Sequence, residues 1–414
     1  MDWLRRLAKN RLLDVGAAVI LLALVARWPV VLPARWRDYD FNQYYVGSRM
    51  ILERQNPYRM SIHPMSAALG FTYGPHMPVA TYPPSFLSLF MLLAALPPRA
   101  AYGVWVFTEI GSLVIILWLM RRLLGERLSA RGWLFVAVLT TTSRTVTYNL
   151  LFSQTQLLLA AMVLAAYAAH RAGRHGWACL TISAAGILKF YPFVLLPWFL
   201  WCGGGTARAR WYRLLGVTGF VLGVVALTGP SLWRDFFQYS IPEGVGDEIG
   251  RTFNYSLSGL VTNLGYARHG YHPTPGEKQW WWFMGTMTGL IVIGVAYYAC
   301  LATRHDPETQ FCLLCVAMLA GTVTVQGFYF IFLAFPLTVA ALRIAAKPTV
   351  WPVICLALIV WALNHLNPPD FFQRHPTWYI FVNEIPLYGV LGTGVFFWRE
   401  IWNHRGPIPA LASD

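Results

Sequence analysis

The residues best suited to chemistry stand shortly after the first long apolar run. Asp40 directly precedes an aromatic stretch containing Tyr44 and Tyr45, and from there to Gln55 apolar residues recur at helical spacings. This pattern predicts a short amphipathic helix lying on a membrane surface, with Asp40 at its N-terminal edge. Such an aspartate can cap the helix, or it can act as a general base that takes the proton of a substrate hydroxyl. Spacing alone leaves both roles open.

Three ionisable residues stand inside otherwise apolar runs: Glu109, Arg144 and Lys189. A charge in such a run is costly, so these residues usually face a cavity or a partner. Lys189 stands close to Pro192, which interrupts helical hydrogen bonding, so residues 177–201 are expected to form two half-helices meeting there. An ammonium group at such a break could hold an anionic phosphate, or it could extend to the membrane interface. Arg144 could contact the same phosphate, and Glu109 could be its structural partner.

Two further segments carry polar side chains that could bind a hydroxylated ligand. Gln154 and Gln156 lie in a short turn between apolar runs, where their amides could form the edge of a sugar-binding site. Farther along, Arg251 and Asn254 add a cation and an amide. Residues 254–256 also match an N-glycosylation acceptor, a pattern that is common by chance.

The sequence does not indicate a metal site or a disulfide framework. Cys312 and Cys315 have a ligand-like spacing, but they lie on one hydrophobic helix with no further ligand nearby. Free cysteines in such positions behave as small hydrophobic residues. His269 and His272 are also spaced like ligands, yet no carboxylate accompanies them. We therefore expect no metal.

The elements that must position these residues are membrane helices. Hydrophobic residues make up 57% of the 414-residue chain and charged residues only 12%, whereas a soluble domain carries about 25% charged residues. Long apolar runs recur along the whole length, and backbone groups inside a bilayer must bond within their own segment. The sequence therefore predicts an all-α polytopic membrane protein, with residues 1–414 forming a single transmembrane domain.

The formal charge of +14 helps to fix the orientation of the chain. The basic residues form short clusters between apolar runs, which is the pattern of cytoplasmic loops and not of a nucleic-acid-binding surface. The apolar run 12–32 is too long for the core of a signal peptide, so it is expected to remain as the first membrane helix. Both termini are expected in the cytoplasm.

Counting crossings between the basic clusters predicts about ten spanning helices. Residues 85–96 are too few to span comfortably and are expected to form a re-entrant or shallow helix. Three longer loops, 33–82, 230–279 and 365–384, then face away from the cytoplasm, and loops of that length usually have a function. The expected spanning segments are 12–32, 102–120, 133–150, 157–170, 214–227, 280–301, 311–325, 328–342, 350–363 and 387–402.

Taken in order, several of these segments resemble glycosyltransferase family 87. The motifs that carry the resemblance run from residue 40 to about residue 336: Asp40 with Tyr44-Tyr45, Asn56-Pro57-Tyr58, Tyr82-Pro83-Pro84, Gln154 with Gln156, Leu188-Lys189 with Pro192, and Asn254-Tyr255-Ser256-Leu257. The resemblance implies a GT-C fold and a donor in which a sugar is linked to polyprenyl phosphate. It also implies that Asp40 is the catalytic base. Many relatives carry a histidine where this chain has Gln326-Gly327-Phe328-Tyr329, which looks more like the arabinofuranosyltransferase branch than the mannosyltransferase branch.

The expected activity is the inverting transfer of a sugar, mannose first and arabinofuranose next, to a cell-envelope glycolipid or glycan. It would take place on the extracytoplasmic side of a bacterial inner membrane, in contact with membrane lipid and without nucleic acid or a cofactor. Cationic side chains would stabilise the departing phosphate, so no metal is required. The residues expected to bind the donor phosphate are Lys189, Arg144 and Arg251. Those expected to bind the sugar or the acceptor are Tyr44, Tyr45, Tyr58, Gln154, Gln156 and Asn254.

Two other classes of membrane protein have to be weighed. A secondary transporter would also carry broken helices and charges within the membrane, but it usually shows internal repeats, and the two halves of this chain show none. A non-catalytic component of glycan assembly is the other alternative. Long outer loops rich in tyrosine, proline and histidine favour an extracytoplasmic enzyme over a transporter.

Overall fold

The structure is a computed structural model that describes residues 40–71, 79–202, 205–245, 254–268, 274–302, 306–365 and 376–403. These residues form helices, and no strand occurs among them. As the composition predicts, the protein is an all-α polytopic membrane protein. The chain groups into two compact units, an N-terminal unit that ends at Val245 and a C-terminal unit that begins at Gly246.

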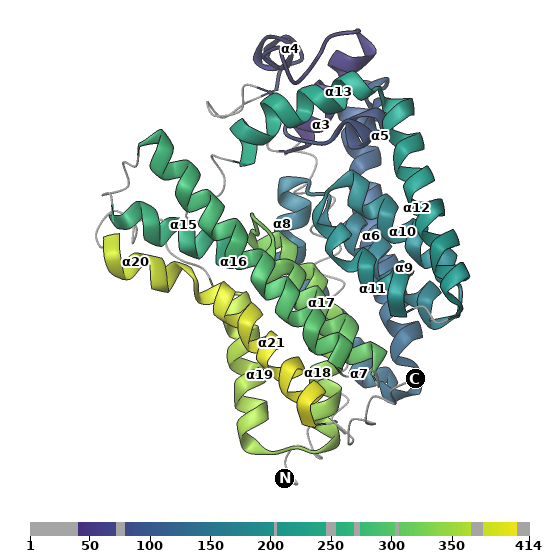
Figure 1. Ribbon diagram of the computed structural model, residues 1–414, viewed down its shortest axis with the longest axis vertical. Coiled ribbons are helices and arrows are strands. Elements are labelled where there is room, and N and C mark those ends of the chain that lie inside the picture. The colour runs from purple at the N-terminus through teal and green to yellow at the C-terminus, as the bar shows by residue number, and fades with distance from the viewer. Residues whose placement is uncertain are drawn as a thin grey trace. The chain divides into compact units, whose positions relative to one another are not determined.

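The N-terminal unit is a helical assembly in which α3 packs on α5, α6 packs along α9, and α10 packs on both α9 and α12 (Figure 1). Its elements are α3 (Asp40–Leu52), α4 (His63–Ala68), α5 (Pro84–Ala94), α6 (Pro98–Leu124), η2 (Gly125–Arg127), α7 (Ala130–Thr142), α8 (Arg144–Phe152), α9 (Gln156–Arg171), α10 (His175–Leu188), η3 (Tyr191–Leu195), α11 (Leu196–Cys202), α12 (Ala207–Thr228), α13 (Pro230–Asp235) and η4 (Phe236–Val245).

The C-terminal unit is built around α17, which packs on α16 and α21, while α15 packs on α16 and α19 on α21. Its elements are α15 (Leu257–Arg268), α16 (Pro275–Ala302), α17 (Pro307–Gly321), η5 (Gly327–Leu333), α18 (Ala334–Ala346), α19 (Val350–Leu363), α20 (Pro376–Asn383) and α21 (Ile385–Asn403). Cys312 and Cys315 are buried within α17.

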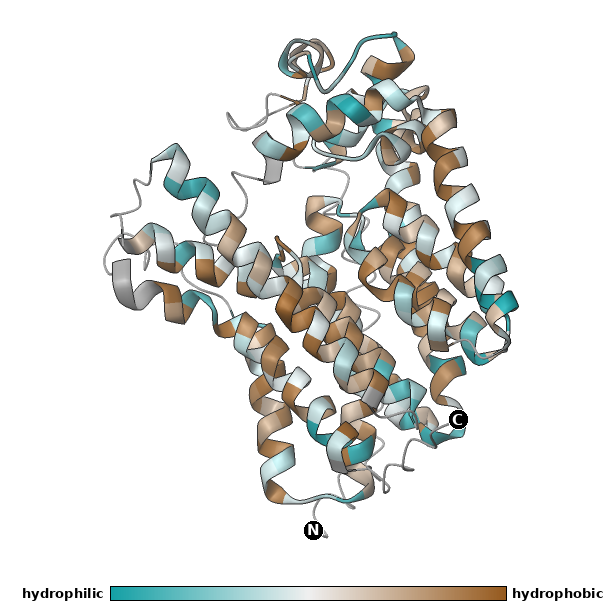
Figure 2. Ribbon diagram, viewed as in Figure 1, coloured by the Kyte–Doolittle hydropathy of each residue, from teal (hydrophilic) through white to brown (hydrophobic). Residues whose placement is uncertain are grey.

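Four of the described helical segments are long and apolar enough to cross a membrane: Pro98–Arg127, Ala207–Thr228, Pro275–Leu301 and Gly327–Ala346. Figure 2 shows α12 hydrophobic along most of its length and hydrophilic at its arginine-rich start. Several other apolar helices, including α5, α9, α10 and α19, are shorter. The expected first membrane helix, residues 12–32, lies outside the described part of the chain.

The helix break predicted near Lys189 is confirmed. Helix α10 ends at Leu188, Lys189 has an extended backbone, and η3 and α11 follow as a second short apolar arm that packs back on α10. The two arms approach closely at Gly186, where a Cβ atom would come within 2.6 Å of the Phe193 ring. Glycine at this position therefore allows the close packing of the two arms.

The segment expected to cross as one helix, residues 133–150, is instead two helices, α7 and α8. The backbone of Ser143 is extended, and its hydroxyl accepts a hydrogen bond from the amide of Val146, which caps the start of α8. The prediction of a single helix was wrong because hydrophobicity alone does not reveal a serine that starts a new helix. Arg144 consequently begins α8 and is not embedded in the middle of a span.

The predicted helix after Asp40 is present as α3, but it does not lie on a surface. Residues from Phe41 to Ser48 are all buried. Phe41 packs against Tyr102 with ring centroids 5.0 Å apart, and Tyr44 packs against Phe86 at 4.9 Å, so aromatic side chains of α5 and α6 cover the helix. The surface prediction was wrong because aromatic residues occupy more than one face of this helix.

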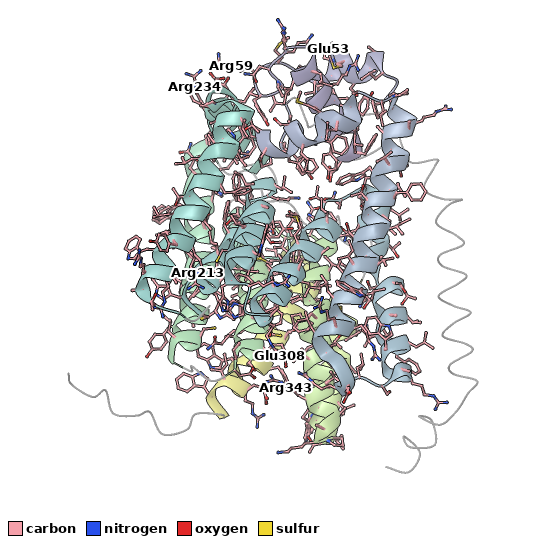
Figure 3. All side chains as sticks on the ribbon, turned by 90° about the vertical axis from the view of Figure 1, so that its right-hand side faces the viewer. Glu53, Arg59, Arg213, Arg234, Glu308 and Arg343 are labelled. Carbon is pink, nitrogen blue, oxygen red and sulfur yellow. The ribbon has the colours of Figure 1, made fainter. Side chains whose placement is uncertain are left out.

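Asp235, at the end of α13, anchors the segment between α3 and α4. Its two carboxylate oxygens accept hydrogen bonds from Asn56 at 2.7 Å and from Arg59 at 2.8 Å. Arg234 also contacts the carboxylate, and Figure 3 shows Arg59 and Arg234 side by side at this end of the unit. The hydrogen bond from Arg59 holds the pKa of Asp235 below its usual value, outweighing the effect of burial.

We expect the Asp235→Asn variant to unfold about 2–4 °C below the wild type at neutral pH, because it loses the charge that Arg59 binds. Because the folded-state pKa is lowered, the ionised carboxyl stabilises the fold above about pH 3.9, the value for an unfolded aspartate. That contribution is lost as the pH falls through the folded-state pKa. Thermal unfolding of purified protein in detergent, followed by tryptophan fluorescence from pH 3 to 7, should show the difference between wild type and variant shrinking at the acidic end. A constant difference would contradict the assignment.

One arginine joins three elements of the C-terminal unit. Arg343 on α18 contacts Asp306 at 2.7 Å, Glu308 at 3.3 Å and Glu400 at 3.3 Å. Figure 3 shows Arg343 and Glu308 close together. Asp306 also caps α17, since its side chain accepts hydrogen bonds from the amides of Glu308 and Thr309. The network therefore ties the start of α17 to α18 and α21.

Candidate functional site

Asp40 meets the polar turn that follows α8. It is the first residue of α3 and is partly exposed, and its Oδ2 accepts a hydrogen bond from Nε2 of Gln154. Both residues are predicted site residues, but their contact was not predicted from the sequence. The contact brings the candidate base to the turn whose glutamine side chains are expected to form the edge of a sugar-binding site.

The turn from Ser153 to Gln156 is tightly held by its backbone. Ser153 is in the left-handed conformation with φ of 54°, and its carbonyl accepts a hydrogen bond from the Trp105 indole at 3.2 Å. The amide of Gln154 donates to the carbonyl of Asn149 at 2.9 Å. These backbone hydrogen bonds fix the positions of several buried polar side chains. One of them is the side chain of Gln154, whose amide nitrogen bonds to Asp40.

Lys189 lies at the break between α10 and η3, and its ammonium nitrogen is 5.1 Å from the centre of the Tyr82 ring. The hydroxyl of Tyr82 in turn accepts a hydrogen bond from Tyr44 of α3 at 3.0 Å. A hydrogen bond from Ser85 to the carbonyl of Ile187 also ties the start of α5 to the last turn of α10. Tyr82 therefore links the lysine to the helix that begins with Asp40.

Tyr82 is a functional residue that was not predicted from the sequence, where it stands only as part of the Tyr82-Pro83-Pro84 motif. Its carbonyl accepts a hydrogen bond from Tyr58 at 2.8 Å, in addition to the contacts of its ring and hydroxyl with Lys189 and Tyr44. The sequence feature that could have identified Tyr82 is its position before two prolines at the start of an apolar run. Proline is favoured in the first turn of a helix, so this pattern predicts that a helix begins here and that the residue before it has a defined position.

The three tyrosines expected to contact sugar or acceptor lie in the core. Tyr44, Tyr45 and Tyr58 are each at most 2% exposed. Their hydroxyls donate within the protein: Tyr45 to the carbonyl of Leu96 at 2.7 Å, and the other two to Tyr82. This packing favours a supporting role beneath Asp40 over direct contact with a ligand.

Arg144 and Glu109 do not form the ion pair that the sequence allowed. The guanidinium carbon of Arg144 lies 4.6 Å from the centre of the Tyr148 ring, one turn further along α8. Glu109 is fully buried on α6, and neither of its carboxylate oxygens has a hydrogen-bond partner among the described residues. The pairing is therefore excluded within the described structure.

Asn254 belongs to the C-terminal unit, where its amide braces the backbone. Its Nδ2 donates to the carbonyl of Val323 and its Oδ1 accepts from the amide of Val325, both at 2.8 Å. Ser256 also donates to Oδ1. The amide expected to bind sugar is thus engaged within its own unit.

Several expected positions lie outside the described residues, namely Arg251, His269 and His272. Within the described part of the chain, no group of three His, Cys, Asp or Glu side chains is placed to hold a metal ion.

The sequence of the chain matches the model of glycosyltransferase family 87 over residues 80–326, which is more than half of its length. The match includes Tyr82, Gln154, Lys189 and Asn254, and begins after Asp40. No curated protein and no solved structure shows significant similarity to the chain. The extent of the family match, together with the apolar helices, establishes that the chain belongs to glycosyltransferase family 87 and is a membrane glycosyltransferase.

Proposed function

We propose that this glycosyltransferase takes its sugar, mannose or arabinofuranose, from a polyprenyl-phosphate donor. The acceptor is a hydroxyl group of a cell-envelope glycolipid or glycan on the extracytoplasmic side of a bacterial inner membrane. The observation that carries the proposal is the hydrogen bond between Gln154 and Asp40, which places a carboxylate beside a buried polar turn. Lys189 supplies a cation at a nearby helix break, connected to the same helix through Tyr82 and Tyr44.

The reaction is a single displacement at the anomeric carbon. The Asp40 carboxylate takes the proton of the acceptor hydroxyl while the acceptor oxygen forms a bond to that carbon from the face opposite the phosphate. The bond between the anomeric carbon and the phosphate oxygen breaks, and its electron pair leaves with the phosphate. A phosphodiester thereby becomes a phosphomonoester, and the configuration of the sugar is inverted.

The amide of Gln154 acts as a positioning group in this mechanism. By donating a hydrogen bond to one carboxylate oxygen it fixes the orientation of Asp40, and a fixed orientation is what a general base needs to meet a hydroxyl proton. The buried tyrosines Tyr44, Tyr45 and Tyr58 hold the surrounding helix and loop in place.

Negative charge grows on the departing phosphate, and cations stabilise it. Lys189 is assigned this role first, with Arg144 of the same unit as a second cation. Stabilisation by side chains removes the need for a divalent metal, and no cofactor is required because the lipid-linked sugar is itself a substrate. Half-helices around Lys189 would leave room for the prenyl chain to enter from the bilayer.

A donor comparison tests the proposal. Purified protein in lipid nanodiscs is given radiolabelled polyprenyl-phosphate mannose, polyprenyl-phosphate arabinofuranose or the nucleotide-linked form of either sugar, with a crude envelope-lipid acceptor. We expect label to reach the acceptor from one of the polyprenyl-phosphate donors and from neither nucleotide donor. Transfer from a nucleotide sugar, or from none of the donors, would overturn the assignment of the donor class.

A further inference from the structure

A second carboxyl group, this one fully buried, lies on α6 one helical turn after Trp105, which bonds to the polar turn. Glu109 is 0% exposed and is flanked along the buried face of the helix by Trp105 and Ser112. Neither of its oxygens has a hydrogen-bond partner among the described residues. An unpaired carboxyl group inside a membrane helix is costly, so such a residue is retained where it faces a ligand, a water-filled space or a partner.

The packing of α6 on α9 places Glu109 beside the start of α9. Trp105 stands near the start of α6 and donates a hydrogen bond to the carbonyl of Ser153, shortly before α9 begins. Because α9 packs along α6, it runs from this point toward the C-terminal end of α6. Glu109 follows Trp105 by one helical turn and lies on the same face. Gln156, the first residue of α9, is just beyond Ser153. Glu109 and Gln156 therefore lie in the same helix interface at a similar depth.

Neither side chain forms a hydrogen bond with the other or with any further described residue. Both amide atoms of Gln156 lack hydrogen-bond partners among the described residues, as do the carboxyl oxygens of Glu109. The hydroxyls of Ser153 and Thr155 and the amide oxygen of Gln154 are also buried and have no hydrogen-bond partner among the described residues. Buried polar atoms are nearly always paired, so a concentration of unpaired ones around a single turn indicates a site for a polar ligand.

The chemistry of these groups selects the ligand. A carboxyl group, two amides and two hydroxyls include strong acceptors and several donors but no cation, so they suit a neutral molecule with adjacent hydroxyl groups and not a phosphate. We propose that Glu109 and Gln156 bind the hydroxyl groups of the donor's sugar and thereby select which sugar is transferred. The inference rests on the proposed function and assigns the phosphate of the same donor to Lys189, on a different element.

Binding measurements with and without the sugar test the inference. Full-length wild type, Glu109→Gln and Gln156→Met are titrated in nanodiscs with polyprenyl-phosphate mannose, polyprenyl-phosphate arabinofuranose and bare polyprenyl phosphate, using thermophoresis. Both substitutions preserve side-chain size, and size-exclusion profiles and melting temperatures verify folding. Ser112→Ala is the matched control, because its hydroxyl is buried on the same face of α6 but bonds to the carbonyl of Thr108 within the helix.

We expect Glu109→Gln and Gln156→Met to weaken binding of the preferred sugar-bearing donor by about tenfold or more, the loss expected for hydrogen bonds to charged or buried groups. Binding of bare polyprenyl phosphate should stay unchanged, and Ser112→Ala should match the wild type with every ligand. Unchanged affinity for the sugar-bearing donor in both variants, or an equal loss for bare polyprenyl phosphate, would overturn the inference alone. Failure of the wild type to bind either sugar-bearing donor would overturn the proposed function and this inference together.

Discussion

Replacing Asp40 by asparagine is expected to lower kcat for sugar transfer by about 10²–10⁴-fold, the range for loss of a general base. Asparagine keeps the size of the side chain and an oxygen that can still accept the hydrogen bond from Gln154, but it cannot take a proton. Affinity for the donor should therefore change little, and the protein should remain folded. Initial rates with labelled donor, measured beside donor affinity and melting temperature, provide the test.

Asp38→Asn is the matched control, because it removes the neighbouring acidic side chain in the sequence and leaves Asp40 in place. We expect this control to transfer sugar at the wild-type rate. Wild-type kcat in Asp40→Asn would remove Asp40 from the chemistry. A loss confined to Asp38→Asn would move the base to that residue.

Replacing Lys189 by methionine is the substitution with the second largest expected effect, a fall in kcat of about 10²–10³-fold. Methionine keeps most of the length of the lysine side chain but removes the charge that stabilises the departing phosphate. The ammonium group also lies over the ring of Tyr82, so the melting temperature should fall slightly as well. Steady-state rates at saturating donor separate the effect on transfer from the effect on donor binding.

Lys278→Met provides the comparison, because Lys278 is an exposed lysine of α16. It should retain wild-type kcat, and Lys189→Arg should recover part of the lost rate because it restores the positive charge. If Lys189→Met instead retained full kcat and only melted earlier, the lysine would serve the fold through Tyr82 and not the reaction.

The sequence predicted the helices well where a local pattern determines them. The apolar run 350–363 coincides with α19 (Val350–Leu363), and the break after Leu188 follows from a lysine and a proline close together. It failed at Ser143, where one capping hydroxyl divides an apolar segment into two helices. It also failed for α3, because helical spacing indicates that a helix forms but does not show how many of its faces other helices will cover.

The site was harder to predict than the helices because its contacts join distant segments. Asp40 and Gln154 were each singled out by residue type and position, but their hydrogen bond depends on how α3 and the turn after α8 pack together. The same is true of the tyrosines, since a tyrosine suits a sugar-binding surface and an aromatic core equally well. The sequence alone showed that Glu109 places a carboxyl group in an apolar run, where burial is costly. Only the packing of the helices showed that Arg144 does not form an ion pair with it.

In the proposed reaction, a sugar moves in one displacement from a lipid phosphate to an acceptor hydroxyl. A direct test is to determine by NMR the anomeric configuration of the product formed by the wild-type enzyme, and to measure the amount of polyprenyl phosphate released. We expect a configuration opposite to that of the donor and one polyprenyl phosphate released for each sugar transferred. Retained configuration, or transfer without release of polyprenyl phosphate, would contradict it.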